Sequence, residues 1–411
     1  MLFKPRRPRP DKREKISPRI THLALFGGFL GSGKTTLIVE LGKILIDRGH
    51  SVAIVTNDQG EFLVDSWFAR CSGFVTAEVL NGCLCCRFSN FIECVTYLTE
   101  NTDAEYIFAE PVGSCTDLRA TVMAPVLAYH REKFLLRPLM IVVDAFRLAG
   151  KFSSMDLENP VEPAEILIGH QMREADVLLV SKKDMIKDGA VQTRGIERLR
   201  RLNPDARILS YSIRSGEGLE EIADIVTTEQ AEPRASVDLD YSSYAEAEAQ
   251  YGWYNGTWDL LCKKGMNLEE IAGSLLSGLV TQDEAEGLTH AKLQVVWEQG
   301  AFKLSSVSGL LQVDGQPPFE NRPELAKFTL NIRALMDPEE LKRRVDFLLN
   351  RTLLQIGGTM QGYRMQTLIP SSPNPEMRLC GLEGEPFGNH GIAGGCGNPA
   401  CAQGCMHARD R

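Results

Sequence analysis

The chain has 411 residues, 43% of them hydrophobic and 24% charged, so it can bury sizeable cores and is long enough for two domains. Its formal net charge of -9 argues against a general binder of nucleic acids or membrane surfaces, because nothing global attracts phosphate polyanions. No stretch approaches the roughly 20 apolar residues of a membrane helix, and the N-terminus lacks the features of a secretory signal. We therefore expect a cytoplasmic protein whose eleven cysteines ligate metal or do redox chemistry instead of forming disulfides.

Residues 1–19 form a basic arm, in which lysines and arginines alternate with prolines and almost no apolar residue occurs. Such a segment cannot bury enough apolar surface to offset the cost of ordering it. We predict that this arm is disordered, and we do not expect nucleic acid as a partner.

Residues 20–230 repeat one pattern, in which a short apolar run ends in polar or glycine residues and an amphipathic segment follows. The runs, which we interpret as strands, are residues 21–26, 51–56, 105–109, 139–143, 177–180 and 206–210. Most of them lack polar alternation, as expected of strands buried on both faces. Apolar residues at helical spacing predict a helix from residue 34 to about residue 48. The order predicts an open α/β fold.

The first strand is followed by a phosphate-binding sequence, Gly28-Phe29-Leu30-Gly31-Ser32-Gly33-Lys34-Thr35. The backbone N–H groups of such a turn and the N-terminus of the next helix bind phosphate, and the glycines permit close approach. Lys34 supplies a cation for the β- and γ-phosphates, and the Thr35 hydroxyl is a predicted Mg²⁺ ligand. Ser32 and Thr36 complete the predicted phosphate contacts. Strand, motif and helix together predict a P-loop nucleoside triphosphatase.

A second nucleotide signal, Ser181-Lys182-Lys183-Asp184, directly follows the strand at residues 177–180. The Asp184 carboxylate can accept hydrogen bonds from N1–H and the 2-amino group of guanine, a pattern that adenine does not offer. It therefore predicts GTP, with Lys182 and Ser212 also near the base; the alternative is a solvated charged loop. The usual GTPase form has Asn where this chain has Ser181, whose hydroxyl is shorter and binds the base side less firmly.

Three cysteines lie within the short segment Asn81-Gly82-Cys83-Leu84-Cys85-Cys86. Cys83 and Cys85 lie on the same side of an extended backbone, and Cys86 can turn in after a bend. Three thiolates facing one ion suit Zn²⁺ and other borderline-soft metals, and they leave a fourth position open for release of the metal. Two alternatives stay open, a closed zinc site completed by Cys94, Cys71 or a histidine, and plain buried thiols.

Three carboxylates are candidates for the catalytic set together with Lys34. Glu110, at the end of the strand at residues 105–109, is placed to hold Mg²⁺ directly or through water. Asp58 and Glu61 follow the second strand, where they could hold a metal or position water. Hydrolysis needs charge neutralisation at the phosphates and an oriented water. The alternative for each carboxylate is a loop charge in solvent.

After a predicted linker at residues 231–250, residues 251–370 show a different pattern. Its predicted elements are strands at residues 254–261, 290–297, 302–307, 328–333 and 363–369 and helices at residues 268–279 and 341–354. This order suggests a smaller, ferredoxin-like α+β domain. In the tail at residues 371–411, Cys396, Cys401, Cys405 and His407 offer a second metal site or a scavenging arm, or are idle thiols in a disordered tail.

The order and spacing of these motifs resemble those of the CobW-type metal-associated GTPases, relatives of the GTPases that assist nickel insertion into hydrogenase and urease. The resemblance covers about residues 20–225 and rests on residues 28–37, 57–65, 81–86, 110–113, 142–145 and 181–184. The C-terminal half resembles the family mainly through residues 288–293. Where the family often has Glu, this chain has Asp58, a shorter side chain.

The resemblance implies a P-loop fold with a mostly parallel sheet, of the SIMIBI type. It also implies that GTP hydrolysis is coupled to delivery of a transition metal, Zn²⁺ first and Co²⁺, Fe or Ni²⁺ as others. The recipient would be a client metalloprotein or an enzyme of a cobalamin-related pathway, bound through the C-terminal domain; a homodimer stays open. Two other functions are a metal-sensing regulatory GTPase without transfer and an ATP-dependent metabolic kinase or ligase. If GTP and metal binding are linked, the linkage is reciprocal.

Overall fold

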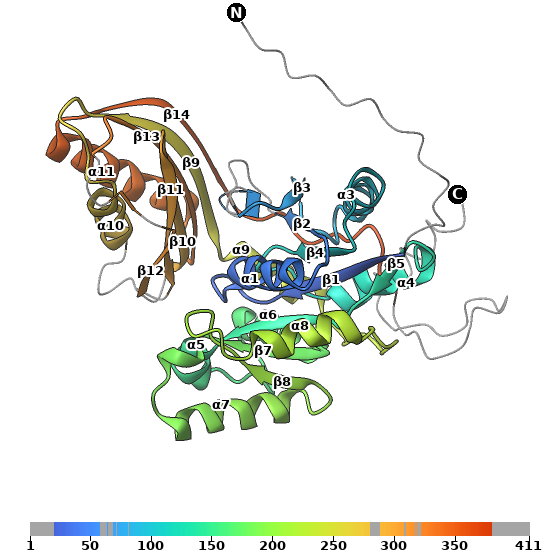
Figure 1. Cartoon of the computed structure of the whole chain (residues 1–411). Coiled ribbons are helices and arrows are strands. Elements are labelled where there is room, and N and C mark those ends of the chain that lie inside the picture. The colour runs from blue at the N-terminus through green and yellow to red at the C-terminus, as the bar shows by residue number, and fades with distance from the viewer. Residues whose placement is uncertain are drawn as a thin grey trace, which may run out of the picture.

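The computed structural model describes residues 20–57, 64, 69–70, 72–80, 82–279, 288–307, 310–315, 317–318 and 322–379. An eight-stranded sheet organises the N-terminal domain and a six-stranded sheet the C-terminal domain, and the two lie side by side (Figure 1). Within the described ranges, no helix has both the length and the apolarity needed to cross a bilayer.

The N-terminal sheet is parallel at every described strand pair and has the order β3-β2-β4-β1-β6-β7-β8, with β5 beside β1. Its strands are β1 (Thr21–Gly27), β2 (Val52–Asn57), β3 (Val75–Val79), β4 (Tyr106–Glu110), β5 (Phe134–Leu136), β6 (Met140–Asp144), β7 (Val177–Ser181) and β8 (Arg207–Ser210). Strands β2, β4, β6 and β7 are buried along their whole length, which confirms the mostly parallel α/β sheet predicted from their apolar runs.

Helices cover both faces of this sheet. They are α1 (Lys34–Asp47), α3 (Phe88–Asn101), α4 (Ala124–Tyr129), α5 (Ala145–Ala149), α6 (Pro163–Glu174), α7 (Gly189–Leu202) and α8 (Leu219–Thr228), with a π-helix at Arg119–Met123 and 3₁₀ turns at Lys151–Ser154 and Lys183–Met185. Alternate residues of β1 enter opposite cores, Leu23 and Leu25 on the side of α3 and α6, Ala24 and Phe26 on the side of α1 and α8. This follows from the two-residue period of a strand.

The C-terminal sheet is antiparallel, with the order β12-β11-β10-β13-β9-β14. Its elements are β9 (Gly252–Leu261), α10 (Leu268–Leu279), β10 (Leu288–Trp297), β11 (Gly300–Val307), β12 (Leu310–Gly315), β13 (Leu325–Ala334), α11 (Pro338–Ile356) and β14 (Thr359–Leu368). The predicted α+β order is confirmed, and β11 and β12 extend the sheet at its edge. Asp337 caps α11 and Pro338 opens it, as the sequence suggests.

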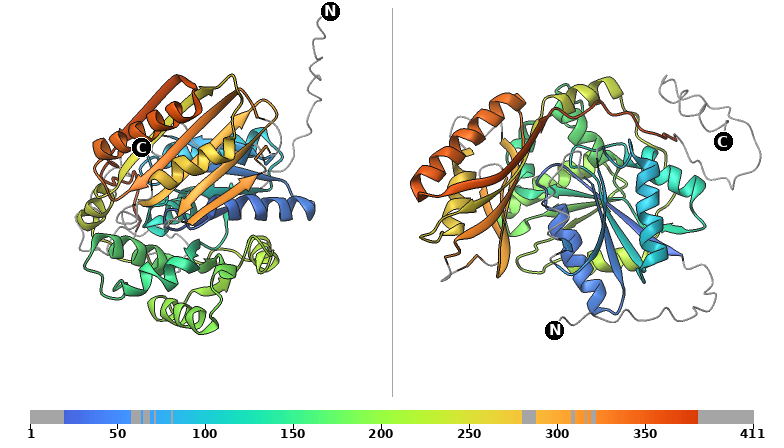
Figure 2. Two further views of the ribbon diagram at one scale, coloured as in Figure 1. Left: turned by 90° about the vertical axis from the view of Figure 1, so that its left-hand side faces the viewer. Right: turned by 90° about the horizontal axis from the view of Figure 1, so that it is seen from above.

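The C-terminal sheet has one face covered by helices and one face turned to the N-terminal domain. Helices α10 and α11 pack on the outer face, which Figure 2 shows in front of the strands. Along β10, Ala291 and Leu293 enter this helix-covered core, whereas His290 and Lys292 project to the other side, where they line a cavity shared with the N-terminal domain. The C-terminal sheet therefore presents polar side chains to the N-terminal domain.

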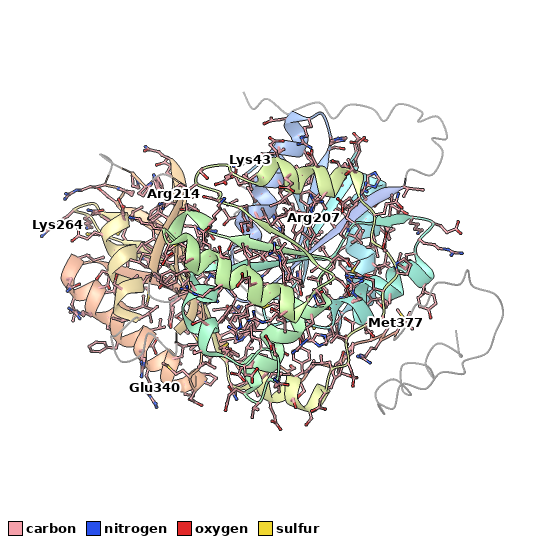
Figure 3. All side chains as sticks on the ribbon, turned by 90° about the horizontal axis from the view of Figure 1, so that it is seen from below. Lys43, Arg207, Arg214, Lys264, Glu340 and Met377 are labelled. Atoms are coloured by element: carbon pink, nitrogen blue, oxygen red, sulfur yellow. The ribbon has the colours of Figure 1, made fainter. Side chains whose placement is uncertain are left out.

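Two connecting segments are more structured than the sequence suggests. Within the predicted linker, α9 (Tyr241–Ala249) is a helix capped by Asp240, and Tyr244 and Ala247 pack into the N-terminal core. Its apolar residues are too few to show a helical period, so the sequence pattern did not predict this helix. After β14 the chain returns to the N-terminal domain, where Met377, labelled in Figure 3, packs against the core.

Candidate nucleotide and thiol sites

The loop between β1 and α1 has a backbone that only glycine adopts without strain. Gly28, Gly31 and Gly33 have φ angles of 129°, 76° and 101°. A Cβ on Gly28 would also lie 2.3 Å from the carbonyl oxygen of Val142, and one on Gly31 would lie 2.9 Å from Val307. The loop is therefore wrapped tightly at the N-terminus of α1, the arrangement that binds phosphate.

The polar side chains at the start of α1 meet the end of β4. The Lys34 ammonium donates a hydrogen bond of 2.7 Å to the carbonyl oxygen of Gly28. The Thr35 hydroxyl donates to Glu110 Oε1 at 3.0 Å, and both side chains are buried. Thr36 is half-buried in the same turn. A hydroxyl and a carboxylate oxygen this close are the hard ligands that Mg²⁺ uses, so Thr35 and Glu110 fit a magnesium ion bound with nucleotide.

Asp184 lies at the carboxyl end of the sheet, after β7. Its Oδ1 accepts a hydrogen bond of 2.7 Å from the Ser212 hydroxyl, and its Oδ2 lies 3.9 Å from Arg214, whose side chain is 85% exposed and projects from the surface in Figure 3. The carboxylate side chain itself is 28% exposed. It is thus held in place by Ser212 while remaining accessible to a base.

Ser181 and Lys182 join the base side to the phosphate loop. The Ser181 hydroxyl donates to the carbonyl oxygen of Ser32 at 2.7 Å. Lys182, in a left-handed conformation with φ 58°, pairs with Asp144 at 2.7 Å and donates to the carbonyl oxygen of Gly31 at 3.1 Å. Ser181, which stands where GTPases usually have asparagine, thus holds the phosphate loop through a hydrogen bond.

The three cysteines predicted to face one ion converge. Cys83, Cys85 and Cys86 lie in the loop between β3 and α3, and their sulfur atoms are all within 4.8 Å of one another. The Cys85 and Cys86 sulfurs are 3.8 Å apart, and those of Cys83 and Cys85 are 2.7 Å apart. Cys83 and Cys85 are buried and Cys86 is half-buried. This cluster is a donor set for a soft or borderline metal.

A fourth thiol, which the sequence analysis did not single out, joins this cluster. Cys115 lies in the loop after β4, and its sulfur is 3.7 Å from that of Cys85. Cys94, proposed above as a completing ligand, instead donates to the carbonyl oxygen of Glu78, and Cys71 lies outside the described residues. Parallel strands bring their carboxyl ends to one edge. A cysteine directly after β4 was therefore a usable signal.

The four thiols differ in their acidity. Hydrogen bonds from Cys115 and Cys85 hold the pKa of Cys83 well below its usual value. The pKa of Cys85 is raised by its hydrogen bonds, first of all the one with Cys115. The pKa of Cys86 is raised to about 12, first of all by its hydrogen bond with Cys83. One sulfur can therefore carry negative charge while its neighbours donate to it.

The segment after β14 lies against the thiol cluster. The backbone N–H of Asn374 donates to the Cys86 sulfur at 3.2 Å, and that of Glu376 to the Cys85 carbonyl oxygen at 3.1 Å. The Glu376 carboxylate accepts from both the backbone and the hydroxyl of Ser89 at the start of α3. The C-terminal end of the described chain thus shields one side of the thiols.

The phosphate loop also borders a cavity between the two domains. The N-terminal domain contributes polar side chains that include Lys34, Asn57 and Glu110, and the C-terminal sheet contributes Trp253, His290, Lys292, Asn331 and Arg333. Burial, and then the nearby cations beginning with Lys292, hold the pKa of His290 well below its usual value. The C-terminal domain therefore adds basic groups and a neutral histidine beside the phosphate loop, which the sequence analysis did not foresee.

Several predicted residues fall outside the described ranges. These are the basic arm at residues 1–19, the carboxylates Asp58 and Glu61, and the tail ligands Cys396, Cys401, Cys405 and His407. Their roles stay predictions.

Residues 22–210 match the family model "CobW/HypB/UreG, nucleotide-binding domain". Three curated relatives are each similar to less than half of this chain. "Zinc chaperone YjiA" of Escherichia coli (strain K12) is 27% identical over 47% of this chain and 58% of its own length. "Zinc chaperone CobW" of Sinorhizobium sp is 27% identical over 39% of this chain and 50% of its own length.

The third relative is "Zinc-regulated GTPase metalloprotein activator 1" of Dictyostelium discoideum, 25% identical over 46% of this chain and 45% of its own length. The chain thus spans about half the length of the curated relatives that it matches. The residues that match the family model include the phosphate loop and the thiol cluster.

Proposed function

We propose that the chain is a GTP-hydrolysing metallochaperone that binds a transition metal and delivers it to a client protein, since residues 22–210 match the family model "CobW/HypB/UreG, nucleotide-binding domain". Cys83, Cys85 and Cys86 would hold the metal. Zinc is the leading candidate, since two relatives are named zinc chaperones and the third a zinc-regulated GTPase. Cobalt, iron and nickel are the other metals that a thiolate-rich site accommodates.

The observation that carries this proposal is the convergence of three thiols beside the nucleotide edge of one parallel sheet. The cysteine loop follows β3 and the magnesium residue Glu110 ends β4, while β2 pairs with both strands. When two sites lie on adjacent loops at one edge of a sheet, a movement of one loop can affect both sites. That arrangement supports a carrier whose metal affinity depends on the bound nucleotide.

The geometry of the nucleotide site supports a role for each of its residues. Thr35 and Glu110 would hold Mg²⁺, which neutralises charge on the β- and γ-phosphates when bound. Lys34 would bind the same phosphates, and Asp184 would select guanine through its two acceptor oxygens. We propose that Asp58 and Glu61 position water or complete a metal shell. The acceptor at Asp184 disfavours an ATP-dependent kinase or ligase, for which an adenine-binding group would be required.

The C-terminal domain would bind the client, in our proposal a metalloprotein or an enzyme of a cobalamin-related pathway. The same architecture would also serve a metal-sensing regulator that transfers no metal. Transfer to a client in the presence of a competing chelator separates the two functions. A chaperone protects the metal during transfer, whereas a sensor loses it to the chelator.

Elemental analysis of the purified protein tests the proposal most directly. We expect a bound transition metal in the wild-type chain and its loss when Cys83, Cys85 and Cys86 are all replaced by serine. Zn²⁺ affinity measured with GDP and with a non-hydrolysable GTP analogue tests the coupling. Equal affinities would refute coupling, and an unchanged metal content in the triple variant would refute the metal site.

A further inference from the structure

We propose that Cys115 is the fourth ligand of the transition metal, and that the loop which carries Cys115 opens or closes the metal site according to the bound nucleotide. This inference rests on the proposed function, because it concerns the same metal. Unlike the other three cysteines, Cys115 belongs to the loop that begins at the magnesium residue Glu110.

Two of the sulfur–sulfur distances in the cluster fit those of a tetrahedral zinc site. Four sulfurs at about 2.3 Å from a zinc ion lie ~3.8 Å from one another. The Cys85 sulfur is 3.8 Å from that of Cys86 and 3.7 Å from that of Cys115. The Cys83 and Cys85 sulfurs, 2.7 Å apart, have to separate when an ion enters. The Cys115 sulfur therefore lies at the separation expected in a tetrahedral zinc site from Cys85, and it has to approach the other thiols when an ion enters.

The surroundings of Cys115 favour a ligand over a filler of the core. A buried cysteine usually behaves as a small apolar residue. Here the side chain is 1% exposed and its sulfur faces another sulfur. The backbone is held from behind, since the Gln171 amide donates to the carbonyl oxygens of Gly113 and Cys115 at 3.1 and 2.9 Å. In the arrangement described here, these hydrogen bonds support the backbone from which the Cys115 thiol faces Cys85.

The loop from Glu110 to Cys115 touches the nucleotide site at two points. Glu110 accepts a hydrogen bond from Thr35, and Gly113 packs so closely that a Cβ on it would lie 2.9 Å from the backbone nitrogen of Leu30. A shift of the phosphate loop or of Glu110 therefore displaces a segment that ends in the fourth thiol. Because the segment from Glu110 to Cys115 is short, a displacement at Glu110 can be transmitted to Cys115.

Ligand number then decides whether the metal is held or released. Four protein thiolates close a tetrahedral site, whereas three leave a position that a client ligand can occupy. With Cys115 bound the cargo is retained. When one nucleotide state withdraws the loop, the thiolate leaves the ion, takes up a proton from solvent and opens the position for transfer.

X-ray absorption of the zinc-loaded wild-type chain counts the sulfur neighbours without any substitution. We expect four sulfurs in one nucleotide state and three sulfurs with one lighter atom in the other, comparing GDP with a non-hydrolysable GTP analogue. Three sulfurs in both states would overturn the ligand assignment. Four in both states would overturn the nucleotide control. A chain that binds no zinc would instead overturn the proposed function.

Cobalt substitution gives a second test. In the nucleotide state that has four sulfur ligands, the thiolate-to-cobalt charge-transfer absorbance of Cys115→Ser should be roughly a quarter below that of the wild type, because one of four thiolates is lost. Cys262→Ser is the matched control, since Cys262 is also buried and unoxidised but donates to the carbonyl oxygen of Ile356 in the C-terminal domain. Unchanged absorbance in Cys115→Ser, with wild-type GDP affinity showing that it folds, would contradict the assignment.

Discussion

The side-chain amide nitrogen of Asn57 donates a hydrogen bond of 2.7 Å to the carbonyl oxygen of Gly82, the residue that precedes the first cysteine of the thiol cluster. The amide oxygen of Asn57 accepts from the backbone N–H groups of Leu84, at 3.0 Å, and Val112, at 3.4 Å. One side chain at the end of β2 thus connects the cysteine loop to the loop that follows Glu110.

We expect Asn57→Ala to weaken the dependence of metal affinity on nucleotide. The substitution leaves the Leu84 N–H and the Gly82 carbonyl without this partner, and each such buried group costs ~1–3 kcal/mol. The ratio of Zn²⁺ affinities in the GDP and GTP-analogue states should therefore approach one. Asn101→Ala is the control, since Asn101 ends α3 and donates to the carbonyl oxygen of Tyr97 at the exposed surface. A wild-type ratio in Asn57→Ala would rule out this link.

Replacing Asp184 by alanine should reduce GTP affinity and leave ATP affinity unchanged. A hydrogen bond to a charged group contributes ~1.5–3 kcal/mol, so GTP should bind roughly 10- to 100-fold more weakly. Competition between GTP and ATP for a fluorescent nucleotide measures both constants. Asp205→Ala serves as control because its side chain is 76% exposed. If both nucleotides lost affinity equally, Asp184 would not be reading the base.

The sequence was sufficient for the parts of the fold that local patterns determine. The apolar runs at β2, β4, β6 and β7 predicted strands because these strands are buried on both faces. Three strands were missed: β3, β5 and β12. The first and last lie at sheet edges, where Leu311 and Val313 of β12 are exposed, and β5 has three residues, so none shows a buried-strand pattern.

Long-range packing explains what the sequence could not indicate in the site. Cysteines 83 to 86 were found because they are close in the chain, whereas Cys115 meets them only through the parallel sheet. Likewise, Arg333 and His290 reach the phosphate loop only because the C-terminal sheet turns its polar face to the N-terminal domain. Such juxtapositions depend on how domains dock, and no local pattern encodes that docking.

Glu110→Gln should weaken the binding of Mg²⁺ with nucleotide and slow GTP hydrolysis. The amide keeps the shape of the side chain and its acceptor for Thr35 but removes the negative charge that an ion requires. We expect a requirement for 10- to 100-fold more Mg²⁺, the order of effect seen when a metal's supporting groups are altered. Hydrolysis measured against Mg²⁺ concentration gives the value.

Glu105→Gln is the matched control for that substitution. It changes the same residue type directly before β4, at the end away from the nucleotide, where Glu105 pairs with His50 at 2.9 Å. Its Mg²⁺ dependence should equal that of the wild type. Identical curves for all three proteins would exclude Glu110 from the magnesium site.

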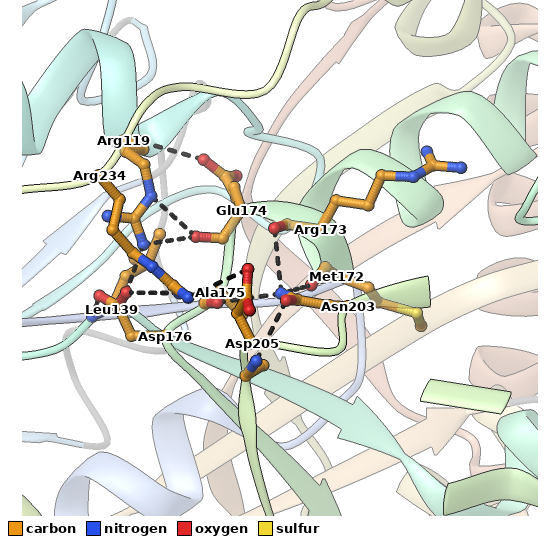
Figure 4. A network of polar contacts seen from close by, with 11 residues as sticks. Arg119, Leu139, Met172, Arg173, Glu174, Ala175, Asp176, Asn203, Asp205 and Arg234 are labelled. Carbon is orange, nitrogen blue, oxygen red and sulfur yellow. Dashed lines mark hydrogen bonds and ion pairs between the residues drawn. The ribbon is translucent and has the colours of Figure 1, made fainter. Parts of the chain in front are cut away.

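The pH dependence of stability should reveal the buried carboxyl of Glu174, at the end of α6. This side chain accepts a hydrogen bond of 3.0 Å from the backbone N–H of Arg119 (Figure 4). It accepts a second one, of 3.3 Å, from the Thr116 hydroxyl. Burial raises its pKa from 4.5 to about 8. The folded protein therefore keeps this proton over a range in which the unfolded chain has already lost it.

The sign of the effect follows from proton linkage. Between the unfolded pKa of 4.5 and the folded pKa of about 8, the unfolded state binds fewer protons, so the free energy of unfolding falls as pH rises. Below that window both states are protonated and the contribution is constant. Each unit of pKa difference corresponds to ~1.4 kcal/mol, so the loss amounts to a few kcal/mol.

Glu174→Gln cannot ionise and should flatten this decline. Urea unfolding at about pH 5.5 and about pH 8 measures the loss of stability, which should be smaller in the variant than in the wild type. Part of the decline should remain, because burial also raises the pKa of Glu248 to about 8. Glu246→Gln, at an exposed position of α9, is the control and should keep the full decline. An equally steep decline in Glu174→Gln would mean that the Glu174 carboxyl is already ionised in the folded protein.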